Sequence, residues 1–74
     1  MQIKIEYCVV WNYLPRATSL VAGILEKYGE SIDSLTIHPS SGGVYEIWKD
    51  DKLIFSKKQE GRFPLSDDEV INQL

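Results

Sequence analysis

The chain has 74 residues, 43% of them hydrophobic and 26% charged, with a formal net charge of −3 at pH 7. We expect one soluble globular domain over residues 1–74, because this length and composition are ordinary for a single small domain. The acidic balance argues against a nucleic acid partner, since phosphate binding requires a basic surface. No apolar run approaches the roughly 20 residues that span a bilayer, so no membrane partner is expected.

The first half of the chain predicts a strand followed by a helix. Residues 2–7 alternate between polar and apolar side chains, as in a strand with one buried face, and residues 9–10 are a candidate extension of that strand. Apolar side chains recur every three or four residues over 15–28, which predicts an amphipathic helix that begins with a proline. Gly23 indicates close packing of this helix on a sheet, and Gly29 is a candidate C-terminal cap.

The second half predicts three further strands. Residues 32–37 form the first of these, with Leu35 and Ile37 facing inward, and residues 39–43 are a loop rich in serine and glycine. Residues 44–48 and 52–57 then form a hairpin across a tight connection at Asp50 and Asp51.

The C-terminal residues predict a loop and a short helix. Residues 59–62 are expected as the loop. Ser66 and Glu69 have the spacing of a capping box, and Leu65 and Val70 have the spacing of a hydrophobic staple.

The resulting order is β-α-β-β-β-α. If the first two strands pair in parallel through a right-handed crossover, the hairpin extends the sheet and the two helices cover its faces or an edge. The sequence therefore predicts an α+β sandwich of thioredoxin-like character with a four-stranded mixed sheet.

Cys8 is the only cysteine, and it falls where the first strand runs into the first helix. A small secreted domain usually carries several disulfides, so one cysteine favours a reducing compartment, and we expect the cytoplasm. In a C-x-x-C redox pair the second sulfur would stand at Trp11, so this chain cannot close an internal disulfide. Taken alone, Cys8 is more often a small buried hydrophobic residue than a nucleophile.

Two blocks of sequence together resemble the selenoprotein W/T/H family of small thioredoxin-like proteins, and the resemblance covers nearly the whole chain. The blocks are Tyr7-Cys8-Val9-Val10-Trp11-Asn12-Tyr13-Leu14-Pro15-Arg16-Ala17, and Gly42-Gly43-Val44-Tyr45-Glu46-Ile47 with Leu53-Ile54-Phe55-Ser56-Lys57-Lys58 and Glu60-Gly61-Arg62-Phe63-Pro64. Family members carry C-x-x-C or C-x-x-selenocysteine after the first strand. Cys8 matches the first position, whereas Trp11 occupies the second.

The resemblance implies a thiol-based redox or thiol-exchange role with Cys8 as the nucleophile. A thiolate at a helix N-terminus is stabilised by the helix dipole, and a cation such as Arg16 would add to this effect. Because Trp11 cannot resolve a mixed disulfide, an external thiol would have to do so. The implied partner is a thiol-containing protein or glutathione, with glutathione as a co-substrate and no other cofactor. The alternative is a redox-inactive protein-interaction module that uses residues 8–13 to contact a protein.

The sequence leaves the role of Trp11 open and suggests no special role for His38. Trp11 is a cover over the thiol, an exposed partner contact, or a core residue packed on Tyr13. Its codon lies one base from UGA, so it is a natural replacement, an engineered one, or a misread selenocysteine. His38 is expected as a solvated strand-end residue. One histidine and one cysteine are too few for a specific metal site, so none is expected.

Overall fold

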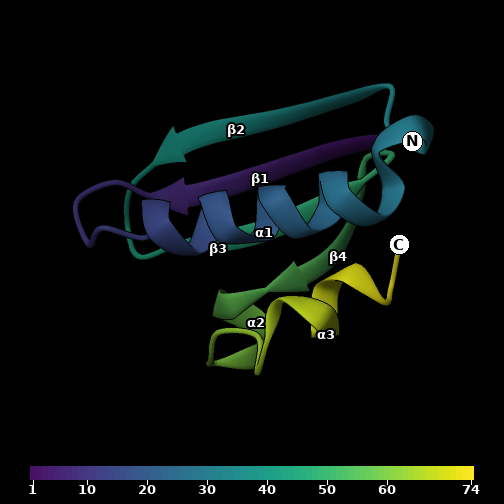
Figure 1. Cartoon of the computed structure of the whole chain (residues 1–74). Coiled ribbons are helices and arrows are strands. Elements are labelled where there is room, and N and C mark those ends of the chain that lie inside the picture. The colour runs from purple at the N-terminus through teal and green to yellow at the C-terminus, as the bar shows by residue number, and fades with distance from the viewer.

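The computed structural model describes residues 1–74 and contains one four-stranded mixed sheet (Figure 1). The sheet order is β2-β1-β3-β4. β1 pairs in parallel with β2 and antiparallel with β3, and β3 pairs antiparallel with β4. The strands are β1 (Gln2–Cys8), β2 (Ser34–Ser40), β3 (Tyr45–Lys49) and β4 (Lys52–Ser56). This confirms the predicted α+β, thioredoxin-like architecture.

The helix α1 (Leu14–Tyr28) covers one face of this sheet, because both elements carry an apolar face with the matching period. In β1 the odd-numbered residues are buried, whereas Gln2 and Lys4 on the opposite face are exposed. The opposite face stays open, and there the Lys4 ammonium lies 4.8 Å from the Trp48 ring centroid. The buried side chains of the first strand, α1 and the third strand are Ile3, Ile5, Tyr7, Ala17, Leu20, Ile24, Tyr45 and Ile47.

The helix α3 (Asp67–Ile71) packs against α1 and completes the core with Val70 and Ile71. A Cβ atom at Gly23 would lie 2.7 Å from Ile71 Cδ1, so Gly23 permits the close approach of α3. We had expected Gly23 to pack on the sheet; its close neighbour is instead a helix.

Two predicted boundaries of strands were wrong. Val9 and Val10 do not extend β1 but form an exposed turn. β2 runs on through Pro39 and Ser40, which we had expected in the loop, because an edge strand tolerates a proline on its unpaired side.

Predictions at the ends of helices were right in position and wrong in detail. Gly29 stands at the C-cap of α1, as predicted, but it keeps a right-handed helical conformation and opens a 3₁₀ turn, η1 (Gly29–Ser31). Ser66 is the N-cap residue of α3, but its side chain makes no capping hydrogen bond, so there is no capping box. Leu65 is 85% exposed and cannot form a staple with the buried Val70.

A short helix, α2 (Lys57–Glu60), replaces part of the expected fourth strand and the loop after it. The Ser56 hydroxyl accepts a hydrogen bond from Gln59 N at 3.2 Å, and Gly61 ends the turn with a φ of 72°. Such a serine at the start and a glycine at the end are the ordinary signals of a helix. None of the helices is both long and apolar enough to cross a bilayer.

Candidate functional site

The loop between β1 and α1, residues 9–13, is tied down by main-chain hydrogen bonds. Val9 N donates to Ser40 O at 3.0 Å, which attaches the loop to the end of β2. Asn12 N donates to Val9 O at 2.9 Å, and Asn12 has a φ of 59°, so the chain turns tightly here. Tyr13 N then donates to Cys8 O at 3.1 Å. We call residues 9–13 the β1–α1 loop.

Cys8, the last residue of β1, is completely buried and belongs to the hydrophobic core. Its N–H donates to Val44 O at 2.9 Å, which holds the residue at the end of the sheet. We had expected an accessible sulfur at the start of a helix. The structure contradicts the accessibility, and it makes Tyr13 the N-cap of α1, so Cys8 lies outside the first helical turn where the dipole acts.

The loop that follows Cys8 presents apolar side chains to solvent. Val9 is 52% exposed, Val10 78% and Trp11 61%. Leu14, at the start of α1, is 43% exposed. Isolated exposed apolar residues are normal on proteins, but a run of neighbouring ones marks an interaction surface. We call Val9, Val10, Trp11 and Leu14 the apolar patch.

Trp11 lies against the backbone of Gly43 in the loop between β2 and β3. A Cβ atom at Gly43 would lie 2.5 Å from Trp11 Cζ3, so only glycine fits beneath the indole. The indole also meets the Tyr13 ring edge-on, at a centroid distance of 6.2 Å. Trp11 therefore packs on Gly43 and Tyr13 with one face and leaves the rest of the ring exposed, so it is not a core residue.

An aromatic cluster supports the patch from the protein interior. The Phe63 ring stands edge-on to Tyr13 at 4.8 Å and to Tyr45 at 5.5 Å between centroids. Tyr45 Oη donates to Arg16 O at 3.3 Å, and burial raises the pKa of the Tyr45 phenol, which stays protonated as a donor. The cluster joins the β1–α1 loop, β3 and the segment before α3, elements that lie far apart in the sequence.

Two cations pack on this cluster. The Arg16 guanidinium carbon lies 3.8 Å from the Phe63 centroid, and it makes no hydrogen bond or ion pair with Cys8. Its suggested role beside the thiolate stays a prediction. Lys57 Nζ lies 5.2 Å from the Phe63 centroid and 5.7 Å from that of Tyr13. Lys57 was placed in a strand from the sequence, and only the helical turn of α2 brings it here.

An open groove of about 370 Å³ lies beside the cluster, between the start of α1 and the segment before α3. The Ser19 hydroxyl donates to Asp67 Oδ2 at 2.6 Å and joins the two helices that flank it. Its lining residues are Pro15, Arg16, Ser19, Tyr45, Pro64, Leu65, Ser66 and Asp67. The groove mixes apolar and charged side chains, and none of them belongs to the apolar patch.

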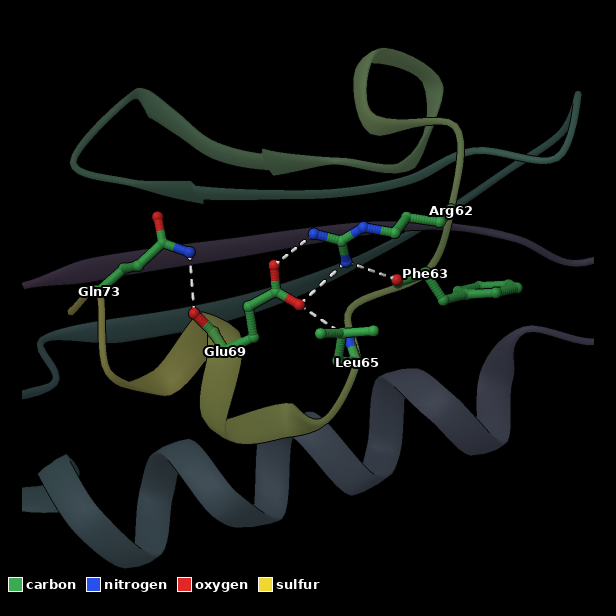
Figure 2. A network of polar contacts seen from close by, with 5 residues as sticks. All are labelled: Arg62, Phe63, Leu65, Glu69 and Gln73. Carbon is green, nitrogen blue, oxygen red and sulfur yellow. Dashed lines mark hydrogen bonds and ion pairs between the residues drawn. The ribbon is translucent and has the colours of Figure 1, made fainter.

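The Phe63 segment is positioned by a polar network centred on Glu69 (Figure 2). Arg62 binds the Glu69 carboxylate through two parallel hydrogen bonds of 2.9 and 2.8 Å, and it also donates to Phe63 O at 2.9 Å. Leu65 N donates to Glu69 Oε1 at 2.7 Å. The glutamate that we had assigned to a capping box therefore anchors the whole loop before α3.

This network lowers the pKa of Glu69 from 4.5 to about 2, chiefly through the hydrogen bond from Arg62 and then through that from Leu65 N. A carboxylate whose pKa is lowered on folding stabilises the protein above its unfolded-state pKa, and the stabilisation disappears as the pH falls to the folded value. Glu69→Gln should therefore lower the melting temperature at pH 7 and have little effect near pH 2. Thermal melts of both proteins between pH 7 and pH 2 test this.

Asp68→Asn is the matched control, because Asp68 lies next to Glu69 in α3 and its side chain takes no part in the network. It should leave the wild-type pH dependence of the melting temperature between pH 5 and pH 2 nearly intact. A Glu69→Gln protein that still loses stability like the wild type over that range would contradict the assignment.

No other candidate metal ligands lie close together. His38 is exposed, as expected, and no group of three or more His, Cys, Asp or Glu side chains is placed to hold a metal ion. The site is thus a buried thiol under an exposed apolar loop, braced by an aromatic cluster.

These features define a small α+β domain with one thiol. The thiol lies at the end of β1, an inner strand of the sheet, directly before an exposed loop. The Rdx family model matches residues 2–74, and the chain belongs to the Rdx family. No curated protein matches the chain.

Two solved structures are closely similar. A selenoprotein W-related protein from Vibrio cholerae is 33% identical over 97% of this chain and 89% of its own, with a TM-score of 0.91. A protein from Bordetella parapertussis is 25% identical over 99% of this chain and 96% of its own, with a TM-score of 0.85. Membership of this family suggests a thiol-based redox role.

Proposed function

We propose that this chain is a redox-inactive protein-interaction module of the Rdx family, which binds a protein partner through the apolar patch. The observation that carries the proposal is the contrast between Cys8, with no exposed surface, and Val10 and Trp11, which are mostly exposed. A nucleophile must reach its substrate, whereas an interaction surface requires exposed apolar side chains in a defined arrangement.

The arrangement of the patch favours binding because the loop is already ordered. Residues held in one conformation lose less entropy when a partner binds. Trp11 is held by Gly43 and Tyr13, and the loop ends are fixed by hydrogen bonds to Ser40 and Cys8. Tryptophan is also enriched among the residues that dominate binding energies at interfaces. In this proposal Cys8 serves as a small core residue.

Site-specific crosslinking in cells of the source organism tests the proposal. A photoreactive residue at Val10 should give a discrete crosslinked species that persists under reducing conditions. The same residue at Leu65 is the matched control, because Leu65 is at least as exposed but lies outside the patch. Trp11→Ala should weaken the Val10 crosslink about tenfold or more, the scale of a strong interface contact.

Cys8→Ala should leave that crosslink unchanged if the thiol has no part in binding. Loss of the crosslink in Cys8→Ala, with the fold retained by circular dichroism, would count against a redox-inactive module. Equal crosslinking from Val10 and Leu65 would show that the patch has no special affinity.

The second candidate function is thiol exchange through Cys8, favoured by the family and by the position of Cys8 directly before the loop. After residues 9–13 move away, the Cys8 thiolate would attack the glutathione sulfur of a glutathionylated protein, forming a Cys8–glutathione mixed disulfide and releasing the protein thiolate. A free glutathione thiolate would then attack the glutathione sulfur of that mixed disulfide, releasing oxidised glutathione and restoring the Cys8 thiolate. This chemistry fits a reducing compartment such as the cytoplasm.

Trp11→Cys tests whether the scaffold still supports dithiol chemistry. If thiol exchange is the function, this variant should form a disulfide between Cys8 and the introduced thiol, and it should reduce a protein disulfide such as that of insulin. Trp11→Ser is the matched control, since it removes the indole without supplying a sulfur. A Trp11→Cys protein with no more reductase activity than Trp11→Ser would weigh against this candidate.

A further inference from the structure

β2 and β4 are the two edge strands of the sheet, and the outer edge of β2 is unpaired (Figure 1). A free strand edge exposes main-chain donors and acceptors that can pair with another strand. β2 has the sequence Ser-Leu-Thr-Ile-His-Pro-Ser and carries no acidic, lysine or arginine side chain. The charged side chains that commonly prevent an edge strand from pairing with another chain are therefore absent from β2.

The direction of the main-chain groups in β2 follows from one hydrogen bond and one proline. Ser40 O accepts from Val9 N, so Ser40 faces β1, and by alternation Thr36 and His38 do so too. Pro39 has no N–H to offer β1, which agrees with its facing outward. The N–H and C=O groups of Leu35 and Ile37 therefore point to the free edge.

The side chains of the same two residues are incompletely covered. Leu35 and Ile37 pair with Ile3 and Ile5 in the β1–β2 register and share their helix-covered face, yet both remain half-buried. Part of the apolar surface of Leu35 and Ile37 therefore stays uncovered beside the unpaired edge.

We propose that a second copy of this chain pairs with β2 in an antiparallel, two-fold symmetric arrangement. In the register that sets Leu35 opposite the partner's Ile37, the two residues exchange both main-chain hydrogen bonds, and symmetry repeats the pair. All four outward N–H groups of Leu35 and Ile37 in the two copies are then satisfied. The same register brings the half-buried leucine and isoleucine side chains together, and no like charges in the two strands oppose each other.

The arrangement closes after two copies. Pro39 has no N–H group to donate to a partner strand. A longer pairing between the two β2 strands, or a shifted register that includes Pro39, would therefore lack a hydrogen bond. The opposite edge of the sheet, β4, is distorted by a register shift and runs directly into α2. Pairing through β2 therefore gives a dimer with one continuous sheet and not a fibre. This inference does not depend on the function of the apolar patch, which lies on another part of the chain.

Sedimentation equilibrium of the full chain over a range of concentrations tests the proposal, since the monomer mass is 8.5 kDa. We expect a concentration-dependent rise to twice that mass. Amide hydrogen exchange at Leu35 and Ile37 should slow as the dimer forms. Leu35→Pro, which removes one outward N–H, and Ile37→Lys, which places a charge at the edge, should each weaken dimerisation about tenfold or more.

Leu65→Lys is the control, because it adds the same charge at an exposed position away from β2 and should leave dimerisation intact. Circular dichroism shows whether each variant keeps its fold. A monomer at every concentration would overturn the proposal. It would also be overturned by a dimer in which the Leu35 and Ile37 amides exchange as fast as in the monomer, whatever the fold of the variants.

Discussion

The folded protein should protect Cys8 from alkylation, with a rate roughly a hundredfold or more below that of the unfolded chain, equivalent to about 3 kcal/mol of local opening. The physical reason is that Cys8 has no exposed surface and lies in the hydrophobic core. The Cys8 N–H donates to Val44 O, and the N–H of the next residue, Val9, donates to Ser40 O, so the reagent reaches the sulfur only after that structure opens. The rate with N-ethylmaleimide, native and in denaturant at one pH, provides the measurement.

Val10→Cys in a Cys8→Ala background is the matched control, because Val10 is 78% exposed only two residues away. That thiol should react in the folded protein nearly as fast as in the unfolded chain. If native Cys8 reacted at a comparable rate, the sulfur would be reachable in solution and thiol exchange would become the better account of the site. Strong protection of Cys8 beside a fast Val10→Cys control supports the interaction module.

Gly43→Ala should be the most destabilising small substitution at the site, costing about 3 kcal/mol. Two effects add at this position. Gly43 has a φ of 73°, a conformation that disfavours any residue with a Cβ atom, and that Cβ atom would lie 2.5 Å from the Trp11 indole. Folded small domains have only about 5–15 kcal/mol of stability, so denaturant unfolding should resolve the loss.

Gly42→Ala separates the two effects. Gly42 has a φ of 77° and nothing within 4 Å of its added Cβ, so it should cost only about 1–2 kcal/mol. In a double-mutant cycle, Trp11→Ala should recover part of the Gly43→Ala loss, because it removes the clash but leaves the backbone strain. Equal costs at Gly42 and Gly43, with no coupling to Trp11, would show that the indole does not rest on Gly43.

The stacking of Trp11 on Gly43 also bears on function. Since the indole is held in place while more than half of it stays exposed, the apolar patch is preorganised for a partner. A Gly43→Ala protein that folds should therefore also lose the Val10 crosslink. Glu69 contributes at a distance, because its network with Arg62 holds Phe63 against Tyr13 and Tyr45.

Periodicity in the sequence was sufficient to predict most of the secondary structure and the α+β class. The alternation in residues 2–7 and the three- and four-residue spacing in residues 15–28 each match one buried face, and the structure has both. The ends of elements were predicted less well. Ser56 with Gly61 and Ser66 with Glu69 both have the signals of helix ends. The Ser56 side chain caps α2, whereas Ser66 stands at the N-cap of α3 without a side-chain hydrogen bond, and Glu69 binds Arg62 and Leu65 N instead of completing a capping box.

By itself the sequence determined that this chain has one thiol and that Trp11 stands where a second thiol would be needed. The two sequence blocks around Cys8 and after Gly42 were also sufficient to indicate the family. Only the tertiary structure decided that Cys8 is buried and that Trp11 is exposed above Gly43. Burial depends on which distant segments pack around a residue, and the local sequence around Cys8 contains no information on the core cluster that encloses it.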